Sequence, residues 1–392
     1  MNSRPLIIFV SLALHLPMSA ANLDLGGLAA GSGDVPYPHP AGTLAGQAEL
    51  APILQAGHPS PDPGSGILLD SPTLRVDPNT TTSAFAGVGS LFTDDDPSDL
   101  FGVLCTATPI DKWHILTAGH CLDITDGDGK SDVLPENALF VLNYGSDFSH
   151  IIPASAIAMH PDYDGTASVS LNDDLAILTL SDPIPDGVPI YPLANPGWLG
   201  FAELIMAGYG ESGDGVNGFF VDPQFNTKRS GANLLEYAEL DDEGSPAVEI
   251  IAWDFEYEGD PGRFDIFGIP FAFENRRETL LGAGDSGSPS FMQNPDDPSD
   301  SNLYLASVNS FGFSIPGVPD HDQADKFGAG SGGIWLNSHY QRWVHQTVPE
   351  ASPRFAEILL GAAALVVTSR ICQPRRQNSG HRQSRGVLQN ES

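Results

Sequence analysis

The sequence has 392 residues, of which 41% are hydrophobic, so the chain can bury a substantial core. Its 50 acidic residues outnumber the 17 basic ones, and the net charge of −33 argues against a nucleic-acid partner, because binding phosphates requires lysine and arginine. With three cysteines, at most one internal disulfide can form, which excludes a small disulfide-stapled fold.

Residues 1–21 have the pattern of a secretory signal peptide. Arg4 supplies a positive charge, an almost unbroken apolar run covers residues 6–16, and small residues end at Ala21. The alternative is a membrane anchor, but the run is shorter than the roughly 20 apolar residues that a spanning helix needs. We therefore predict an exported protein that is cleaved after Ala21.

Residues 22–75 form a segment in which 17 of the 54 residues are glycine or proline. Such a density is typical of flexible or extended chain without a core of its own. We interpret this segment as a propeptide or spacer.

From residue 84 onward, short apolar runs alternate with Gly, Pro, Asp and Asn, which predicts many short strands in a sandwich or barrel. The runs are 85–92, 101–106, 114–117, 139–143, 175–180, 204–207, 248–253, 303–310 and 333–336. Residues 339–346 are the one segment with the pattern of a short amphipathic helix.

Three short motifs stand in this strand-rich region: Leu-Thr-Ala-Gly-His-Cys at 116–121, Asn-Asp-Asp-Leu-Ala-Ile-Leu at 172–178 and Gly-Asp-Ser-Gly-Ser-Pro at 284–289. Each of them alone has an ordinary structural interpretation, such as a strand start or a turn. Together, in the order His, Asp, Ser, they resemble the chymotrypsin-like (trypsin-fold) serine proteases. The resemblance implies an all-β fold of two packed antiparallel barrels with a short C-terminal helix, over residues 76–347.

The resemblance also implies roles for the motif residues. Ser286 would be the nucleophile, His120 its base, and Asp174 the group that orients His120. The main-chain N–H groups of Gly284 and Ser286 would bind the oxyanion. Asp173 is a rival for Asp174, but we prefer Asp174 because Asp-Leu-Ala follows the family pattern.

Further positions follow from the same resemblance. Cys105 and Cys121 would form the disulfide that closes the histidine loop. Substrate would bind along Ser310, Phe311 and Gly312, in a pocket with Leu280 as its floor and Gly312 and Gly333 as its walls. A pocket without an acidic floor favours an apolar side chain before the cleaved bond, unless Glu274 or Glu278 reaches it. Ser288 stands where the family usually has glycine.

Activation would follow the family route, in which a freed N-terminal amine pairs with the aspartate before the nucleophile. That aspartate is Asp285 here, and cleavage after Arg75 would make Val76 the new terminus. The residues after Val76 depart from the usual Val-Gly-Gly pattern.

An acidic loop at 123–132 follows the histidine motif directly. Clustered carboxylates on a glycine-bearing turn suit calcium, which takes six to eight oxygen ligands. Asp126, Asp128 and Asp132 are the candidate ligands, although the full EF-hand pattern is absent. A solvated loop without an ion is the equally weighted alternative.

The C-terminal segment, residues 348–392, joins an apolar stretch at 358–369 to five following arginines. This order is typical of a stop-transfer anchor, although the stretch is barely long enough to span a bilayer as a transmembrane helix. The preceding Val-Pro-Glu-Ala-Ser-Pro at 348–353 resembles the PEP-CTERM sorting tail of exported bacterial proteins. That resemblance implies an exosortase-type processing partner, and a plain anchor or a fortuitous helix are the alternatives.

These features together predict a monomeric serine endopeptidase, secreted or associated with a bacterial cell surface, that acts on polypeptides. Catalysis would require no cofactor, and calcium would have a structural role. The main alternative is a catalytically silent homologue that acts as a surface binding protein, although such proteins usually lack a triad residue. A calcium-dependent adhesin is a third interpretation that rests on the acidic loop alone.

Overall fold

A computed structural model describes residues 36–38, 71–97, 101–166, 172–200, 202–242, 244–315 and 317–348. The predicted signal peptide 1–21, most of the spacer 22–75 and the predicted sorting and anchor segment from residue 349 onward lie outside the described residues. Over the described ranges, no helix combines the length and apolar character needed to cross a membrane.

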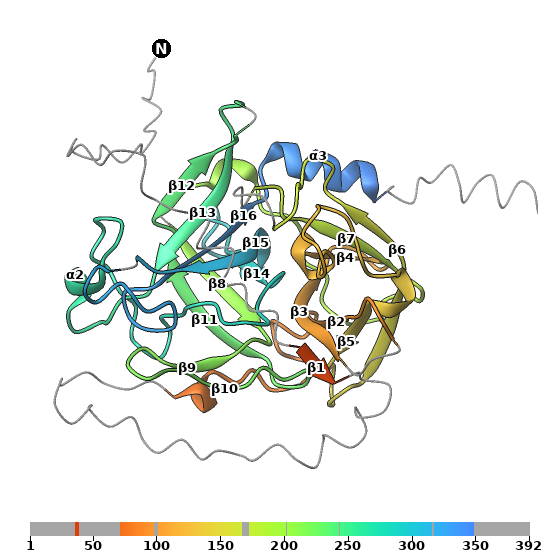
Figure 1. Cartoon of the computed structure of the whole chain (residues 1–392), viewed down its shortest axis with the longest axis horizontal. Helices are drawn as coiled ribbons and strands as arrows, with labels where there is room; N and C mark the ends of the chain where they lie inside the picture. Colours follow the sequence, from red (N-terminus) through yellow and green to blue (C-terminus); the bar gives the residue numbers. More distant parts are fainter. Residues whose placement is uncertain are drawn as a thin grey trace, which may run out of the picture. The chain divides into compact units, whose positions relative to one another are not determined.

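Six antiparallel strands form a closed barrel in the first half of the described chain (Figure 1). They are β2 (Gly89–Thr93), β3 (Phe101–Pro109), β4 (His114–Thr117), β5 (Leu139–Leu142), β6 (His150–Met159) and β7 (Ala176–Leu180). The strands pair in the order β3-β2-β5-β6-β7-β4, and β4 pairs back onto β3. A short β1 (Pro36–Pro38) pairs with the start of β3.

Seven antiparallel strands form a second sheet, in the order β11-β8-β14-β15-β16-β13-β12. They are β8 (Glu203–Gly208), β11 (Arg229–Leu234), β12 (Tyr237–Leu240), β13 (Val248–Asp254), β14 (Pro289–Met292), β15 (Tyr304–Phe313) and β16 (Gly330–Trp335). The sheet curls so that Asn233 on β11 donates a hydrogen bond to the Asp254 carbonyl oxygen on β13, at 2.6 Å. A hairpin of β9 (Ser212–Asp214) and β10 (Gly218–Val221) extends from it.

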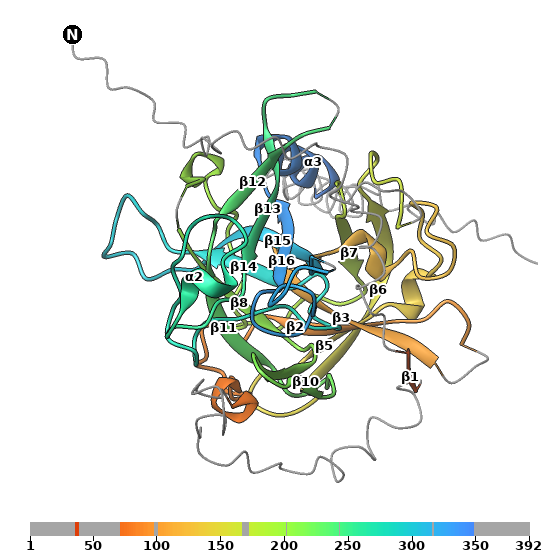
Figure 2. The same cartoon turned by 60° about the vertical axis from the view of Figure 1, so that its left-hand side comes forward.

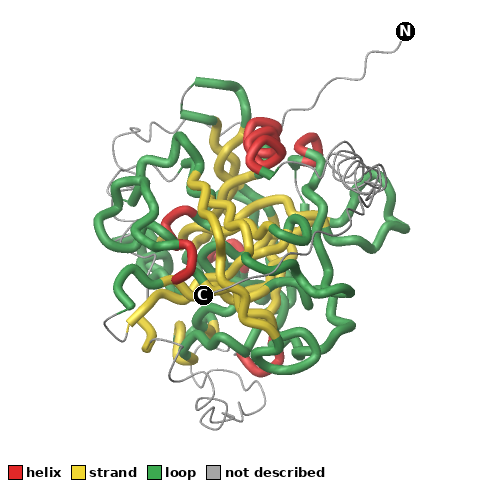
Figure 3. The backbone as a smooth tube through the Cα atoms, turned by 90° about the vertical axis from the view of Figure 1, so that its right-hand side faces the viewer, coloured by secondary structure: helices red, strands yellow, loops and turns green. Residues whose placement is uncertain are grey.

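The two sheets confirm the predicted all-β, double-barrel fold. Figure 3 shows strands at the centre and loops around them. The helices are short: α2 (Pro261–Phe264) and α3 (Ser338–Thr347), with 3-10 turns η3 (Pro72–Arg75), η4 (Gly119–Cys121), η5 (Pro135–Asn137) and η6 (Pro196–Trp198). The predicted C-terminal helix is therefore confirmed as α3, which buries Tyr340 and Val344.

Large apolar side chains fill the interior of each sheet, and burying them supplies the main driving force for folding. Leu91, Phe140 and Leu178 are fully buried in the first barrel. Trp253 and Trp335 are buried in the second sheet and belong to one apolar cluster. These cores support the turns that carry the His120 and Ser286 motifs.

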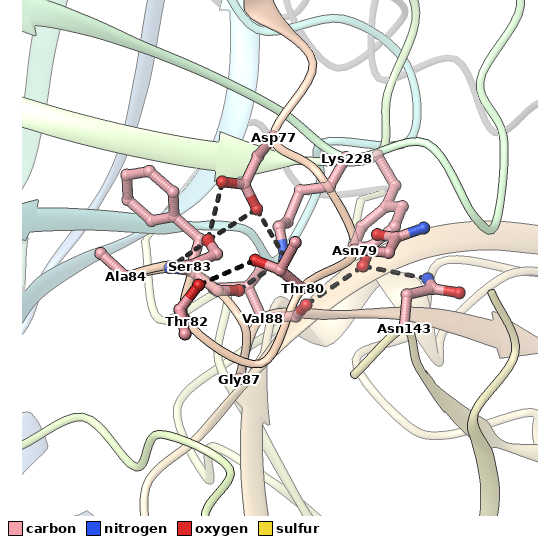
Figure 4. A network of polar contacts seen from close by, with 12 residues as sticks. Asp77, Asn79, Thr80, Thr82, Ser83, Ala84, Gly87, Val88, Asn143 and Lys228 are labelled. Atoms are coloured by element: carbon pink, nitrogen blue, oxygen red, sulfur yellow. Dashed lines mark hydrogen bonds and ion pairs between the residues drawn. The ribbon is translucent and has the colours of Figure 1, made fainter. Parts of the chain in front are cut away.

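A buried ion pair fastens the segment after η3 to the second sheet (Figure 4). Lys228 Nζ lies 3.2 Å from an Asp77 carboxylate oxygen and donates a hydrogen bond to the Phe85 carbonyl oxygen at 2.6 Å. Ser83 donates to the same carboxylate. Burial lowers the pKa of Lys228, and the charge of Asp77 opposes that shift. The pair thus keeps the chain just beyond Arg75 against β11.

Candidate active site

His120 and Asp174 form a buried hydrogen-bonded pair. His120 lies on η4, directly after β4. One carboxylate oxygen of Asp174 accepts the His120 main-chain N–H at 2.8 Å, and the other lies 2.7 Å from Nδ1 of the ring. Ser310 Oγ donates to that second oxygen. Three hydrogen bonds therefore fix the carboxylate and, through it, the orientation of the imidazole.

The protonation of this pair follows from its surroundings. Burial acts to raise the pKa of Asp174, but the nearby His120 and the hydrogen bonds from His120 and Ser310 hold that pKa below its usual value. Asp174 is therefore ionised at neutral pH. Because an ionised carboxylate can only accept hydrogen bonds, the ring proton of His120 lies on Nδ1. Nε2 is then the nitrogen available to accept a proton.

Asp173, next to Asp174 in the chain, contacts His160 and Tyr340 instead of His120. It has a left-handed backbone conformation, with φ of 59°. One of its carboxylate oxygens lies 2.9 Å from His160 Nδ1 and accepts a hydrogen bond from the Tyr340 hydroxyl at 3.0 Å. Of the two neighbouring aspartates, it is Asp174 that contacts His120.

The turn that carries Ser286 is held against β3. The Thr106 N–H donates to the Ser286 carbonyl oxygen at 2.8 Å, and the Thr106 hydroxyl donates to the Gly284 carbonyl oxygen at 2.9 Å. Gly287 has φ of 79°, and a Cβ there would lie 2.0 Å from Thr117 Oγ1. Glycine is therefore required at this position, where the turn packs against the end of β4.

The predicted disulfide between Cys105 and Cys121 is confirmed. Cys105 lies on β3 beside Thr106, and Cys121 lies beside His120 on η4. One strand thus anchors both the histidine turn, through the disulfide, and the Ser286 turn, through hydrogen bonds. This arrangement places the histidine turn and the Ser286 turn beside the same strand, β3.

Residues 85–216 match the Trypsin family model. The match supports a trypsin-like serine protease. The matched stretch includes His120 and Asp174, whereas Ser286 lies beyond it.

Asp285, the residue before Ser286, is held by main-chain donors. Its carboxylate accepts hydrogen bonds from the N–H groups of Gly210, at 2.8 Å, and Gly282, at 3.0 Å. Burial raises the pKa of Asp285 to about 6, while these N–H groups and the charge of Arg229 oppose the shift. Val76, the predicted activation partner of Asp285, forms an isolated β-bridge with Arg229 in the uncleaved chain.

Most of the predicted pocket residues lie on β15 and β16. Leu280 is buried in a cluster with Phe255, Phe264, Phe327 and Ala329. Gly312 has room for a Cβ, because the nearest atom to it would be 3.7 Å away. Gly333 packs tightly on β15, since a Cβ there would lie 2.3 Å from the Val308 carbonyl oxygen. Phe311, between the predicted contact residues Ser310 and Gly312, is buried at 7% exposure.

A small pocket with about 60 Å³ of space for water-sized molecules lies beside the Ser286 turn. Its lining includes Arg75, Arg229, Leu280 and Asp285. The pocket therefore borders the predicted floor residue Leu280 and the residue before Ser286, although His120, Asp174 and Ser286 do not line it. The buried Arg75 side chain occupies one wall and donates hydrogen bonds to the main-chain oxygens of Asn275 and Glu278.

The acidic loop of the first barrel has a different ligand geometry from the predicted one. Carboxylate oxygens of Asp123, Asp126 and Asp128 lie within 4.8 Å of one another. Asp132 accepts the Thr125 N–H at 2.7 Å, and Asp128 pairs with Lys130. The calcium site at Asp126, Asp128 and Asp132 stays a prediction, and the structure adds the buried Asp123 to it. The sequence pattern does not identify Asp123 as a ligand, because spacing alone does not show which carboxylates of the loop are buried together.

Proposed function

We propose that this protein is an exported serine endopeptidase that uses Ser286, His120 and Asp174. The observation that carries the proposal is the Asp174 carboxylate, which contacts both the main chain and Nδ1 of His120 and receives a hydrogen bond from Ser310. The family match over residues 85–216 supports it. Peptide hydrolysis by the purified protein, and its loss when Ser286 is replaced by alanine, tests the proposal.

In the proposed mechanism, Nε2 of His120 takes the proton of the Ser286 hydroxyl as the oxygen attacks the substrate carbonyl. Asp174 stabilises the resulting imidazolium without itself taking the proton. The N–H groups of Gly284 and Ser286 bind the developing oxyanion. His120 then returns the proton to the leaving amine, and water hydrolyses the acyl-enzyme by the same steps in reverse. No cofactor takes part in these steps.

We infer an apolar preference for the side chain before the cleaved bond. Leu280 lies in an aromatic cluster, and a Cβ at Gly312 would make no close contact. Glu274 is exposed and pairs with Arg276, so it does not act as a buried pocket charge. Glu278 is buried and accepts the Phe273 N–H at 2.7 Å.

A peptide-library profile is expected to show cleavage after Leu, Met, Phe or Tyr, because the predicted floor of the pocket is Leu280 and not an acidic residue that would pair with a lysine or arginine charge. Discrimination among these residues should be loose, since one methylene changes selectivity by only about 10- to 200-fold. Glu278→Gln should leave the profile unchanged. If the enzyme cleaved mainly after Arg or Lys and lost this preference in Glu278→Gln, Glu278 would be assigned to the pocket and the inference would be overturned.

Activation by cleavage after Arg75 remains part of the proposal. The Asp77 N–H donates to the Lys228 carbonyl oxygen at 2.9 Å, so a new Val76 terminus would stay tethered beside β11. β11 pairs with β8, where Gly208 directly adjoins the Asp285 carboxylate. Arg75 is only 8% exposed, so η3 must open before a protease can reach the bond.

Sequencing the N-terminus of the fully active enzyme should give Val76. Arg75→Gln should block processing by an arginine-specific protease and leave the chain with low activity. A fully active enzyme whose N-terminus lies well before Val76 would contradict this route.

We also propose that residues 1–21 direct export of the protein. An exosortase-type enzyme would then process its C-terminal segment. The Cys105–Cys121 disulfide supports export, because disulfides persist mainly in oxidising compartments. Polypeptides are the proposed substrates.

A further inference from the structure

Three carboxylates, two of them fully buried, meet at the end of β13 in the second sheet. Asp254 ends the strand, Glu256 follows two residues later, and Glu236 lies in the turn between β11 and β12. One carboxylate oxygen of each lies within 4.8 Å of those of the other two. Asp254 and Glu256 have no solvent exposure, at 0% each. The loop that contains α2 continues from this point (Figure 2).

Several oxygens of this cluster have no hydrogen-bond donor among the described residues. Both carboxylate oxygens of Glu256 are buried without a partner, and so is one oxygen each of Asp254 and Glu236. The remaining Asp254 oxygen accepts the Ile266 N–H, and the remaining Glu236 oxygen accepts the Asp254 N–H at 3.1 Å. Buried polar atoms normally have partners, so four unsatisfied oxygens at one place indicate a group that the protein atoms do not supply.

A proton shared between Glu236 and Asp254 would satisfy one oxygen of each, but it would not give both oxygens of Glu256 a partner. Burial and the charge of Asp254, followed by those of Glu278 and Asp265, raise the pKa of Glu256 to about 9. A cation among the oxygens would remove this repulsion and pair with every free oxygen at once.

A fourth carboxylate lies close to the cluster. Glu278 is fully buried, and one of its oxygens has no hydrogen-bond donor in the described part of the chain. The charge of Asp254 raises its pKa, whereas Arg75 lowers it. Glu278 precedes Leu280 by two residues, so it connects the cluster to the floor of the proposed substrate pocket.

We propose that Glu236, Asp254 and Glu256 bind one calcium ion, with Glu278 as a neighbouring carboxylate. The donors are all hard oxygen atoms, which suit calcium or magnesium and not the nitrogen and sulfur preference of zinc. Calcium fits better than magnesium, because magnesium retains several waters and the cluster is buried. The site is separate from the acidic loop of the first barrel, and it does not depend on the proposed peptidase activity.

The test combines calorimetric titration with calcium and thermal unfolding of the full-length protein after chelation. Glu256→Gln keeps the shape of the side chain but removes its charge. Glu274→Gln, an exposed change nearby on the same loop, is the matched control, and Asp126→Asn removes a ligand of the first-barrel loop. Wild type, Glu274→Gln and Asp126→Asn should all bind calcium at the second-sheet site, whereas Glu256→Gln should bind one ion fewer than wild type.

Calcium at about 100 times its dissociation constant should raise the melting temperature of the wild type by roughly 5 °C through mass action. Asp126→Asn should keep the part of the calcium-dependent rise that comes from the second-sheet site, and Glu256→Gln should lose that part. In chelator, Glu256→Gln should melt close to the wild type, because a pKa of about 9 leaves Glu256 protonated at neutral pH and glutamine has nearly the same shape as the protonated acid. The proposal would be overturned if the wild type bound no calcium. It would also be overturned if the wild type and Glu256→Gln bound the same number of ions.

Discussion

Replacing Ser286 with alanine is expected to lower kcat/KM for peptide hydrolysis by at least about 10⁴-fold while the melting temperature stays unchanged. The reason is that the variant retains the substrate contacts and the oxyanion donors but has no nucleophile. The main-chain bonds between Thr106 and the Ser286 turn do not involve the hydroxyl, so the turn should keep its position. The measurement is initial-rate hydrolysis of a fluorogenic peptide, together with thermal unfolding.

Ser288→Gly is the matched control, because it changes a serine two residues away on the same turn. The Ser288 hydroxyl accepts a hydrogen bond from Asn309 at 2.9 Å, so its loss should lower stability modestly. Activity should remain close to that of the wild type. Retained activity in Ser286→Ala, or equal losses in the two variants, would refute Ser286 as the nucleophile.

Asp174→Asn should reduce kcat by about 10⁴-fold, because an amide that donates to His120 places the ring in the wrong tautomer. Asparagine keeps the size of the side chain, so KM should change much less. A pH–rate profile and kcat for the variant measure the effect.

Asp173→Asn provides the comparison at the adjacent residue. Asparagine tolerates the left-handed conformation found there, so the backbone should not be strained. The variant weakens the contacts to His160 and Tyr340 and should cost about 1–3 kcal/mol of stability with little change in kcat. A loss of kcat in Asp173→Asn that equals the loss in Asp174→Asn would contradict the distinct roles of the two residues.

The strands that are rich in large apolar residues are predictable from the sequence. The runs at 139–143 and 248–253 predict strands, and β5 and β13 lie there. β6 has no such run because it contains Pro153 and several small residues, and β11 has the polar sequence Arg-Ser-Gly-Ala-Asn-Leu. Both become strands through pairing with other strands, β6 with β5 and β7 and β11 with β8, which a local pattern does not encode.

The same distinction applies to the candidate site. The triad motifs carry their own local signatures, so His120 and the Asp174 motif can be recognised without a fold. The bond from Ser310 to Asp174 joins residues 136 positions apart, and only the packing of the two sheets brings them together.

The carboxylate cluster has no signature at all in the sequence. Glu236 lies near Asp254 because β12 and β13 form an antiparallel hairpin in which Tyr237 pairs with Ala252. A shift of one residue in that register would turn side chains to the other face of the sheet. The sequence shows an acidic protein, whereas the register determines which acidic side chains are buried together.

Labelling with a fluorophosphonate probe tests the central claim most directly, because the probe reacts with a serine hydroxyl only when a neighbouring base has activated it. Mass spectrometry of the labelled mature protein should place the adduct on Ser286, and His120→Ala should show little labelling under the same conditions. A folded mature protein that stays unlabelled, or that is labelled equally in His120→Ala, would contradict an activated Ser286 and favour a catalytically silent binding protein.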